Sequence, residues 1–163
     1  MISIGDKHLR IGHLSFGEFL CDRQRCPEQF YIDRGAESQN IAMACFRLMR
    51  EGLHFNICDL ETSHLLNSEV KDLPQRIETN IPKSLLYSCR FWVAHIQEIA
   101  IDMGACGSLM NEVKDFMHQR LIFWLEVMTL IKEVATANIL LLTVARWIQV
   151  STFFIGAMLL SWQ

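Results

Sequence analysis

The side chains best suited to chemistry near the N-terminus are His13 and Ser15, which lie between a strand-like and a helix-like segment. Residues 8–14 alternate polar and apolar side chains, which is β-strand spacing. Apolar side chains then recur at helical intervals from Phe16 to Leu20. Because serine is a good N-cap, we expect Ser15 to start a short helix, whose dipole would favour an anion beside His13. The alternative is a partly buried His13 that is satisfied by a backbone carbonyl.

The other residues that could act in catalysis are scattered along the chain. The sequence contains neither an H-E-x-x-H metal motif nor a nucleophile elbow, and no spacing pairs a nucleophile with a histidine base. We also expect Glu61 and Glu69 to be solvated. The sequence therefore predicts a protein that is not an enzyme and has no catalytic residue. The dispersed histidines are His54, His64, His95 and His118.

The six cysteines are spread over the first two thirds of the chain. Because no apolar leader precedes them, we interpret them as reduced thiols and expect the chain to be cytoplasmic. A zinc site is an alternative, with one half from Cys21 and Cys26 and the other from His54 and Cys58. Neither half is a C-x2-C pair, so we predict no metal site.

Composition places the chain among globular proteins. It has 163 residues, of which 51% are hydrophobic and 20% charged, so it can bury a substantial core. Its net charge of −3 and its lack of a long basic run argue against nucleic-acid binding. Eight glycines and three prolines are too few for a turn-rich all-β protein.

Helical apolar spacing dominates the chain after residue 37. The first long helix is predicted over residues 38–51, with Gly52 after it in a conformation that needs positive φ. A short helix should start at Pro74. A longer helix should start at Pro82, with its apolar stripe formed by Leu85, Cys89, Trp92, Ile96 and Ile99.

The next helix should be the central one of the bundle. Two glycines, Gly104 and Gly107, are expected to end the helix before it, and Ser108 to cap the new one. Its apolar stripe continues as far as Ile131 and becomes apolar on most sides after Leu121. A Trp or Met stripe with this spacing is typical of a core and not of a cofactor site.

The C-terminal segment, residues 139–160, is strongly apolar and long enough to span a membrane. Arg146 and Gln149 interrupt it, and an arginine near the centre of a span costs about 2.5–3.5 kcal/mol. The alternative is an exposed apolar tail that would normally have a partner domain. A membrane location therefore stands as the alternative to a cytoplasmic one.

Residues 13–20, HLSFGEFL, resemble the His-x-Ser-Phe-x-(Glu/Asp)-Phe-Leu motif that closes the winged-helix part of NACHT-type signalling NTPases. Five later segments, in the same order, resemble the helical region after the NACHT domain in fungal NLR-like STAND proteins. This resemblance covers residues 8–149. Its later segments are residues 30–33, 43–49, 53–63, 87–95 and 120–127.

Two parts of that family are missing from this chain. No G-x-x-x-x-G-K-[ST] phosphate loop and no WD-repeat propeller occur, so we expect a fragment of a larger architecture, such as a truncated gene product. The resemblance implies an all-α helical bundle with a short N-terminal β-hairpin as the remnant of a winged helix. The implied domains are a remnant and linker at 1–35, a helical domain at 36–149 and an apolar tail at 150–163.

The function implied by the resemblance is that of a non-catalytic regulatory region, which couples nucleotide state to other domains. In related proteins the motif histidine contacts the β-phosphate of bound ADP, and His13 occupies that position. This chain has no nucleotide pocket of its own, so no cofactor is expected, and the partners would be other proteins or the missing NACHT and WD-repeat portions. The alternatives are an all-α interaction scaffold and a small membrane protein with one C-terminal span.

Overall fold

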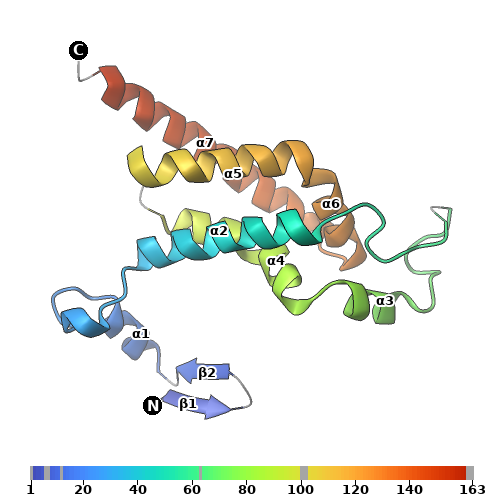
Figure 1. The fold of residues 1–163 in the computed structure, drawn as a ribbon, viewed down its shortest axis with the longest axis horizontal. Coiled ribbons are helices and arrows are strands. Elements are labelled where there is room, and N and C mark those ends of the chain that lie inside the picture. The colour runs from blue at the N-terminus through green and yellow to red at the C-terminus, as the bar shows by residue number, and fades with distance from the viewer. Residues whose placement is uncertain (1, 6–7, 12, 63, 100–102, 161–163) are drawn as a thin grey trace. The chain divides into compact units, whose positions relative to one another are not determined.

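The computed structural model divides into two compact units, Met1–Glu37 and Ser38–Gln163. All regular structure from Leu14 onwards, in the described part of the chain, is helical (Figure 1), which confirms the predicted all-α class. The expected boundary at 149/150 lies inside one continuous helix. The described residues are 2–5, 8–11, 13–62, 64–99 and 103–160.

The first unit contains a short two-stranded sheet, one helix and one helical turn. The strands are antiparallel, and Ile2 lies opposite Ile11 while Gly5 lies opposite His8. The assignment of this pair to a winged helix stays a prediction. The elements are β1 (Ile2–Gly5), β2 (His8–Ile11), α1 (Leu14–Leu20) and the 3-10 turn η1 (Glu28–Phe30).

The second unit is a helical bundle. Helices α4, α5, α6 and α7 pack on one another (Figure 1). Helix α2 contacts α4 and α5 through aromatic side chains. The helices are α2 (Arg34–Gly52), α3 (Leu73–Asn80), α4 (Lys83–Gln97), α5 (Met103–Gln119), α6 (Leu121–Leu130) and α7 (Val134–Leu160).

Helix α2 starts four residues before its predicted start. The Ala36 backbone N–H donates to Asp33 Oδ1 at 3.1 Å, so Asp33 supplies the cap that the apolar pattern did not reveal. The buried face of α2 in the bundle is formed by Ala42, Cys45, Phe46 and Met49.

The prediction of a positive φ at Gly52 is wrong. No glycine in the described residues has a positive φ, and Gly52 is the last residue of α2. A Cβ atom at this position would lie 2.9 Å from Cδ2 of Leu85 on α4. A residue larger than glycine at this position would therefore require the buried side chain of Leu85 to shift.

The expected helix boundaries between α4 and α6 also need correction. Helix α5 begins at Met103 and runs through Gly107 and Ser108, so these residues neither end one helix nor cap the next. The predicted central helix breaks at Arg120, where φ is −125° and ψ is −12°. No glycine or proline lies at this break, so a breaker residue does not account for it.

Four aromatic side chains from four helices meet in the centre of the bundle. Trp92 on α4 lies 4.9 Å from Phe116 on α5, 5.3 Å from Phe46 on α2 and 6.2 Å from Trp124 on α6, measured between ring centroids. Such tilted and edge-on contacts stabilise a core beyond the burial of their area. The stripe predicted for α4, from Leu85 to Ile99, is confirmed as buried.

Candidate functional site

His13 is the N-cap residue of α1, whereas the sequence predicted Ser15 as the N-cap and His13 as a residue before it. The Ser15 backbone N–H donates to His13 Nδ1 at 3.2 Å, and Ser15 Oγ lies 2.6 Å from the same nitrogen. Ser15 therefore lies inside the first turn, and its prediction as the N-cap is wrong. Because Nδ1 accepts within this turn, Nε2 is the ring nitrogen left to carry the proton. An exposed His13 of this tautomer can donate to an anion through Nε2.

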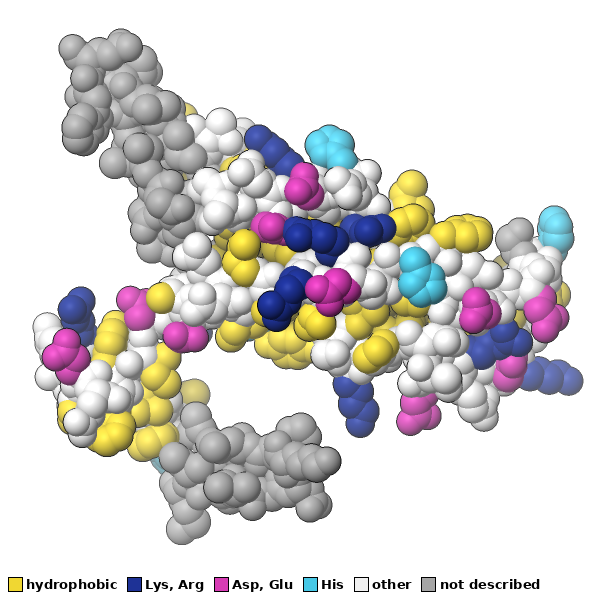
Figure 2. Space-filling model, in the orientation of Figure 1, with side chains coloured by type: hydrophobic (Ala, Val, Ile, Leu, Met, Phe, Trp, Pro, Cys, Tyr) yellow, Lys and Arg dark blue, Asp and Glu magenta, His cyan; other side chains and the backbone are white. Residues whose placement is uncertain are grey.

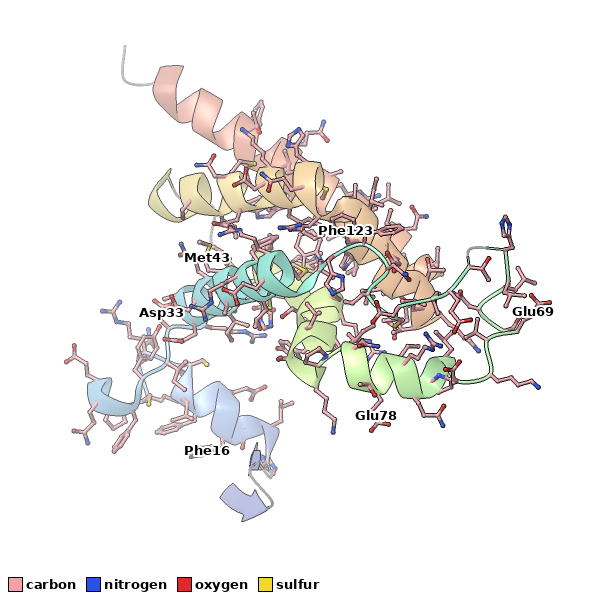
Figure 3. All side chains as sticks on the ribbon, turned by 45° about the vertical axis from the view of Figure 1, so that its right-hand side comes forward. Phe16, Asp33, Met43, Glu69, Glu78 and Phe123 are labelled. Atoms are coloured by element: carbon pink, nitrogen blue, oxygen red, sulfur yellow. The ribbon has the colours of Figure 1, made fainter. Side chains whose placement is uncertain are left out.

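Helix α1, which follows His13, has the apolar face that the spacing of its large apolar residues predicts. The rings of Phe16 and Phe19 are half-buried and lie 6.5 Å apart (Figure 3 labels Phe16). Leu20 adds its backbone carbonyl, which accepts from the Ile32 N–H at 2.9 Å and ties the following loop to α1. His13 is thus positioned at the start of a short helix that the following loop contacts through this hydrogen bond.

The predicted halves of the alternative zinc site belong to different units. Cys21 and Cys26 belong to the first unit, whereas His54 and Cys58 belong to the second. Across the described residues, no group of three or more His, Cys, Asp or Glu side chains is arranged to hold a metal ion.

The loop between α2 and α3 is held by a carboxylate that sequence reasoning did not single out. Glu126 on α6 accepts the backbone N–H groups of Asn56 and Ile57, at 3.2 Å and 3.1 Å. Asn56 has φ of 53°, and its side chain accepts from and donates to the backbone of Leu60. This left-handed turn is possible because asparagine tolerates such a conformation and satisfies its own loop.

Arg76 on α3 holds the other side of this loop. Its guanidinium donates to the carbonyl oxygens of Cys58 and Asp59 at 3.4 Å and 2.5 Å, and to Asp72 Oδ2 at 2.7 Å. The hydrogen bond from Arg76 lowers the pKa of Asp72 below its ordinary value. Glu61 lies 3.7 Å from the same guanidinium and is exposed, as predicted. Glu69 is exposed too, on the outer part of the loop (Figure 3).

A shallow open depression of about 500 Å³ lies between this loop and α6. Phe55, Leu60 and Leu65 line its apolar part, and Glu126 lines its polar part. The carboxylate of Glu126 is already engaged by two backbone donors, which leaves it poorly placed as a general base. Glu126 therefore acts here as an acceptor that holds the loop.

One histidine of the second unit is paired with a phenol. Tyr87 and His95, on α4, lie two turns apart, and the phenolic oxygen is 2.8 Å from His95 Nε2. Burial lowers the pKa of His95 and raises that of Tyr87, so the neutral pair, with the phenol as donor, is favoured. The ring of Phe91 lies 4.9 Å from that of Tyr87. His54 and His118 each bond only to nearby backbone carbonyls among the contacts that the structure describes.

Charged side chains do not form a patch of one sign over α2 and α5. Figure 2 shows basic and acidic groups intermixed on this face of the bundle. Arg50 on α2 pairs with Glu112 on α5, which neutralises one of these cations. This face therefore lacks the one-signed surface that phosphate backbones require.

Comparisons with known proteins give no family for this chain. No family model, no curated protein and no solved structure matches it. The resemblance to NACHT-type proteins therefore stays a prediction.

Proposed function

We propose that this chain is a non-catalytic regulatory region of a NACHT-type (STAND, NLR-like) signalling protein. One observation supports this proposal more than any other. Phe46, Trp92 and Trp124 come from three separate segments that carry the resemblance, and their rings lie in one buried cluster. The three segments that resemble the family's helical region thus contribute side chains to one common core. A single helical domain requires such a shared core.

In this proposal β1, β2 and α1 are the end of a winged helix, and His13 contacts nucleotide held by another domain or chain. The geometry of His13 is compatible with that role, because Nδ1 is engaged with Ser15 and Nε2 carries the donor. The helical unit that follows in the chain would transmit the presence of the nucleotide to partner proteins. The chain would have no affinity of its own for ADP or ATP.

The test uses the full chain and a recombinant NACHT domain from a fungal STAND protein. We expect the chain to bind that domain more tightly with ADP than without it, and His13→Ala to remove the ADP-dependent part. His118→Ala is the matched control, because His118 is exposed and lies outside the matched motif. Absence of any binding to the NACHT domain, or micromolar binding of ADP to the chain alone, would overturn the proposal.

A membrane protein is the second candidate, and α7 is the observation that favours it. Val134–Phe153 is long and apolar enough to cross a bilayer, and 17% of this stretch is buried within the structure. A core helix of the same composition would be mostly buried. Extraction of the expressed chain with alkaline carbonate separates the candidates, since an integral span stays with the membrane fraction.

A third candidate, an all-α interaction scaffold, needs no nucleotide. It would bind proteins through helical faces of the second unit. Retention of partner binding after His13→Ala and without ADP would favour it over the regulatory role.

A further inference from the structure

The depression between the α2–α3 loop and α6 is bordered by large apolar side chains that the fold leaves exposed. Phe55 is 77% exposed and Leu65 is 51% exposed, and both line the depression together with Glu126. Ile122 is 76% exposed and lies one helical turn before Glu126 on α6, so these two side chains share one face of the helix. Exposed apolar side chains of the loop and of α6 are therefore neighbours of the Glu126 carboxylate.

The charged groups of this depression are carboxylates. Glu61 and Glu126 line it, and among its described lining residues there is no lysine or arginine. The nearest cation to Glu61 in an ion pair is Arg76, at 3.7 Å, which already pairs with Asp72 at 2.7 Å. Glu126 forms no ion pair with any residue that the structure describes. The depression is therefore complementary in charge to a cation.

Glu126 can accept further hydrogen bonds although it holds the loop. Its Oε2 accepts the Asn56 N–H and its Oε1 accepts the Ile57 N–H, at 3.2 Å and 3.1 Å. An ionised carboxylate has about four lone-pair positions on its two oxygens, so each oxygen retains the capacity for another donor. The two parallel N–H donors of a guanidinium match such a pair of oxygens, and the resulting charge-assisted bonds are stronger than neutral ones.

The ring of Phe55 favours arginine over lysine as the source of that cation. It borders the same depression as Glu126, and Phe55 directly precedes Asn56, which donates to this carboxylate. A planar guanidinium can stack on an aromatic ring while its N–H groups bind a carboxylate in its plane, which a compact ammonium cannot do. The aliphatic stem of an arginine can at the same time cover apolar surface such as that of Leu65.

We propose that this depression binds an arginine side chain of a partner protein between Glu126 and the ring of Phe55. Apolar residues beside that arginine cover Leu65 and Ile122. This cover excludes water from the ion pair, which a free guanidinium compound would leave exposed, so the geometry favours a protein segment. The site lies in the second unit and does not use His13, so the inference is independent of the proposed regulatory role.

The test is an NMR titration of the full, isotope-labelled chain with two peptides. One is acetyl-Ala-Leu-Arg-Leu-Ala-amide, and the other has citrulline, which has nearly the shape of arginine without its charge, in the same position. The amide resonances of Asn56 and Ile57 report on the site directly, because both N–H groups donate to Glu126. We expect the arginine peptide to shift both resonances saturably, and the citrulline peptide to bind at least about tenfold more weakly.

A variant of Phe55 separates the proposed contact from the integrity of the loop. Phe55→Ser removes the exposed ring and leaves Glu126 and its two backbone donors in place, so it should weaken binding of the arginine peptide by at least about threefold. Phe30→Ser, at a 58% exposed position of the first unit, is the matched control and should leave binding unchanged. Glu126→Gln is less suitable, because it also loosens the loop.

The proposal is overturned if the arginine peptide causes no saturable shift of the two resonances, or if both peptides bind equally. It is also overturned if Phe55→Ser leaves the affinity for the arginine peptide unchanged. Acetyl-arginine amide that binds as tightly as the peptide would assign the site to free guanidinium compounds instead of a protein. The ADP-dependent binding of the NACHT domain is measured separately, so the two proposals can fail independently.

Discussion

The indole Nε1 of Trp124 donates a hydrogen bond to the backbone carbonyl oxygen of Cys89 over 3.0 Å, and both residues are fully buried. This bond joins α6 to α4 in the middle of the aromatic core. Trp92, in the same cluster, is equally buried, but its Nε1 has no partner in the described structure. Two similar side chains in one core thus differ in whether their single donor is satisfied.

We expect Trp124→Phe to destabilise the protein more than Trp92→Phe. Both substitutions remove similar ring volume, but the first also removes a hydrogen bond that contributes about 0.5–1.5 kcal/mol. The second removes a buried donor that is already unsatisfied, which offsets part of the packing loss. Urea unfolding of the two variants should show a difference of about 1 kcal/mol. Equal losses would show that the bond to Cys89 adds nothing to stability.

Glu126→Gln should loosen the loop between α2 and α3. The natural carboxylate accepts the Asn56 and Ile57 N–H groups with separate oxygens, whereas glutamine has only one acceptor oxygen. A hydrogen bond to a charged group contributes about 1.5–3 kcal/mol, so we expect a loss of that order and faster proteolysis within the loop. Glu78→Gln, at an exposed position of α3, is the matched control. Unchanged proteolysis would exclude Glu126 as the loop's anchor.

Gly52→Ala should destabilise the bundle, although alanine favours helices. Its Cβ would lie 2.9 Å from Leu85 Cδ2, so a buried side chain must shift, at a cost of about 1–3 kcal/mol. Gly107→Ala is the control, since no described atom outside its own helical turn and chain neighbours lies within 4 Å of its Cβ position in α5. There we expect a gain of about 0.5–1 kcal/mol from helix propensity. Thermal melting of both variants gives the signs directly, and a gain at both positions would mean that Leu85 moves aside freely.

Alkaline pH should destabilise the protein through its buried thiols. Burial raises the pKa of Cys89 from 9.0 to about 12 and also raises the pKa values of Cys45 and Cys58. Above pH 9 the unfolded chain loses these protons while the folded chain keeps them, so the free energy of unfolding falls as pH rises toward 12. Each such thiol contributes a slope of up to about 1.4 kcal/mol per pH unit.

Urea unfolding between pH 8 and pH 11 measures this slope. Cys89→Ala should flatten it, because one of the thiols that titrate only in the unfolded chain is removed. A slope identical to that of the natural chain would contradict the assignment to Cys89. Cys21→Ala, at a half-buried position of the first unit, serves as the control.

Apolar spacing was sufficient to identify the helices and much of the core. The stripe from Leu85 to Ile99 was predicted and is buried, because a period near 3.6 leaves one face for the interior. The spacing of apolar residues does not show where several helices begin, end or break. The cap at Asp33, the helical conformation of Gly107 and the break at Arg120 all depend on neighbours or on context that a periodic pattern averages out.

The sequence by itself determined the helical class of this protein, Cys89 as a core residue, and His13 as a residue at the start of a helix. Only the tertiary structure decided that Glu126 anchors a loop some seventy residues earlier in the chain. It also decided which face of α7 is covered, because long-range contacts select one stripe from a helix that is apolar nearly all round. Local patterns follow from backbone geometry, whereas these choices follow from which surfaces meet.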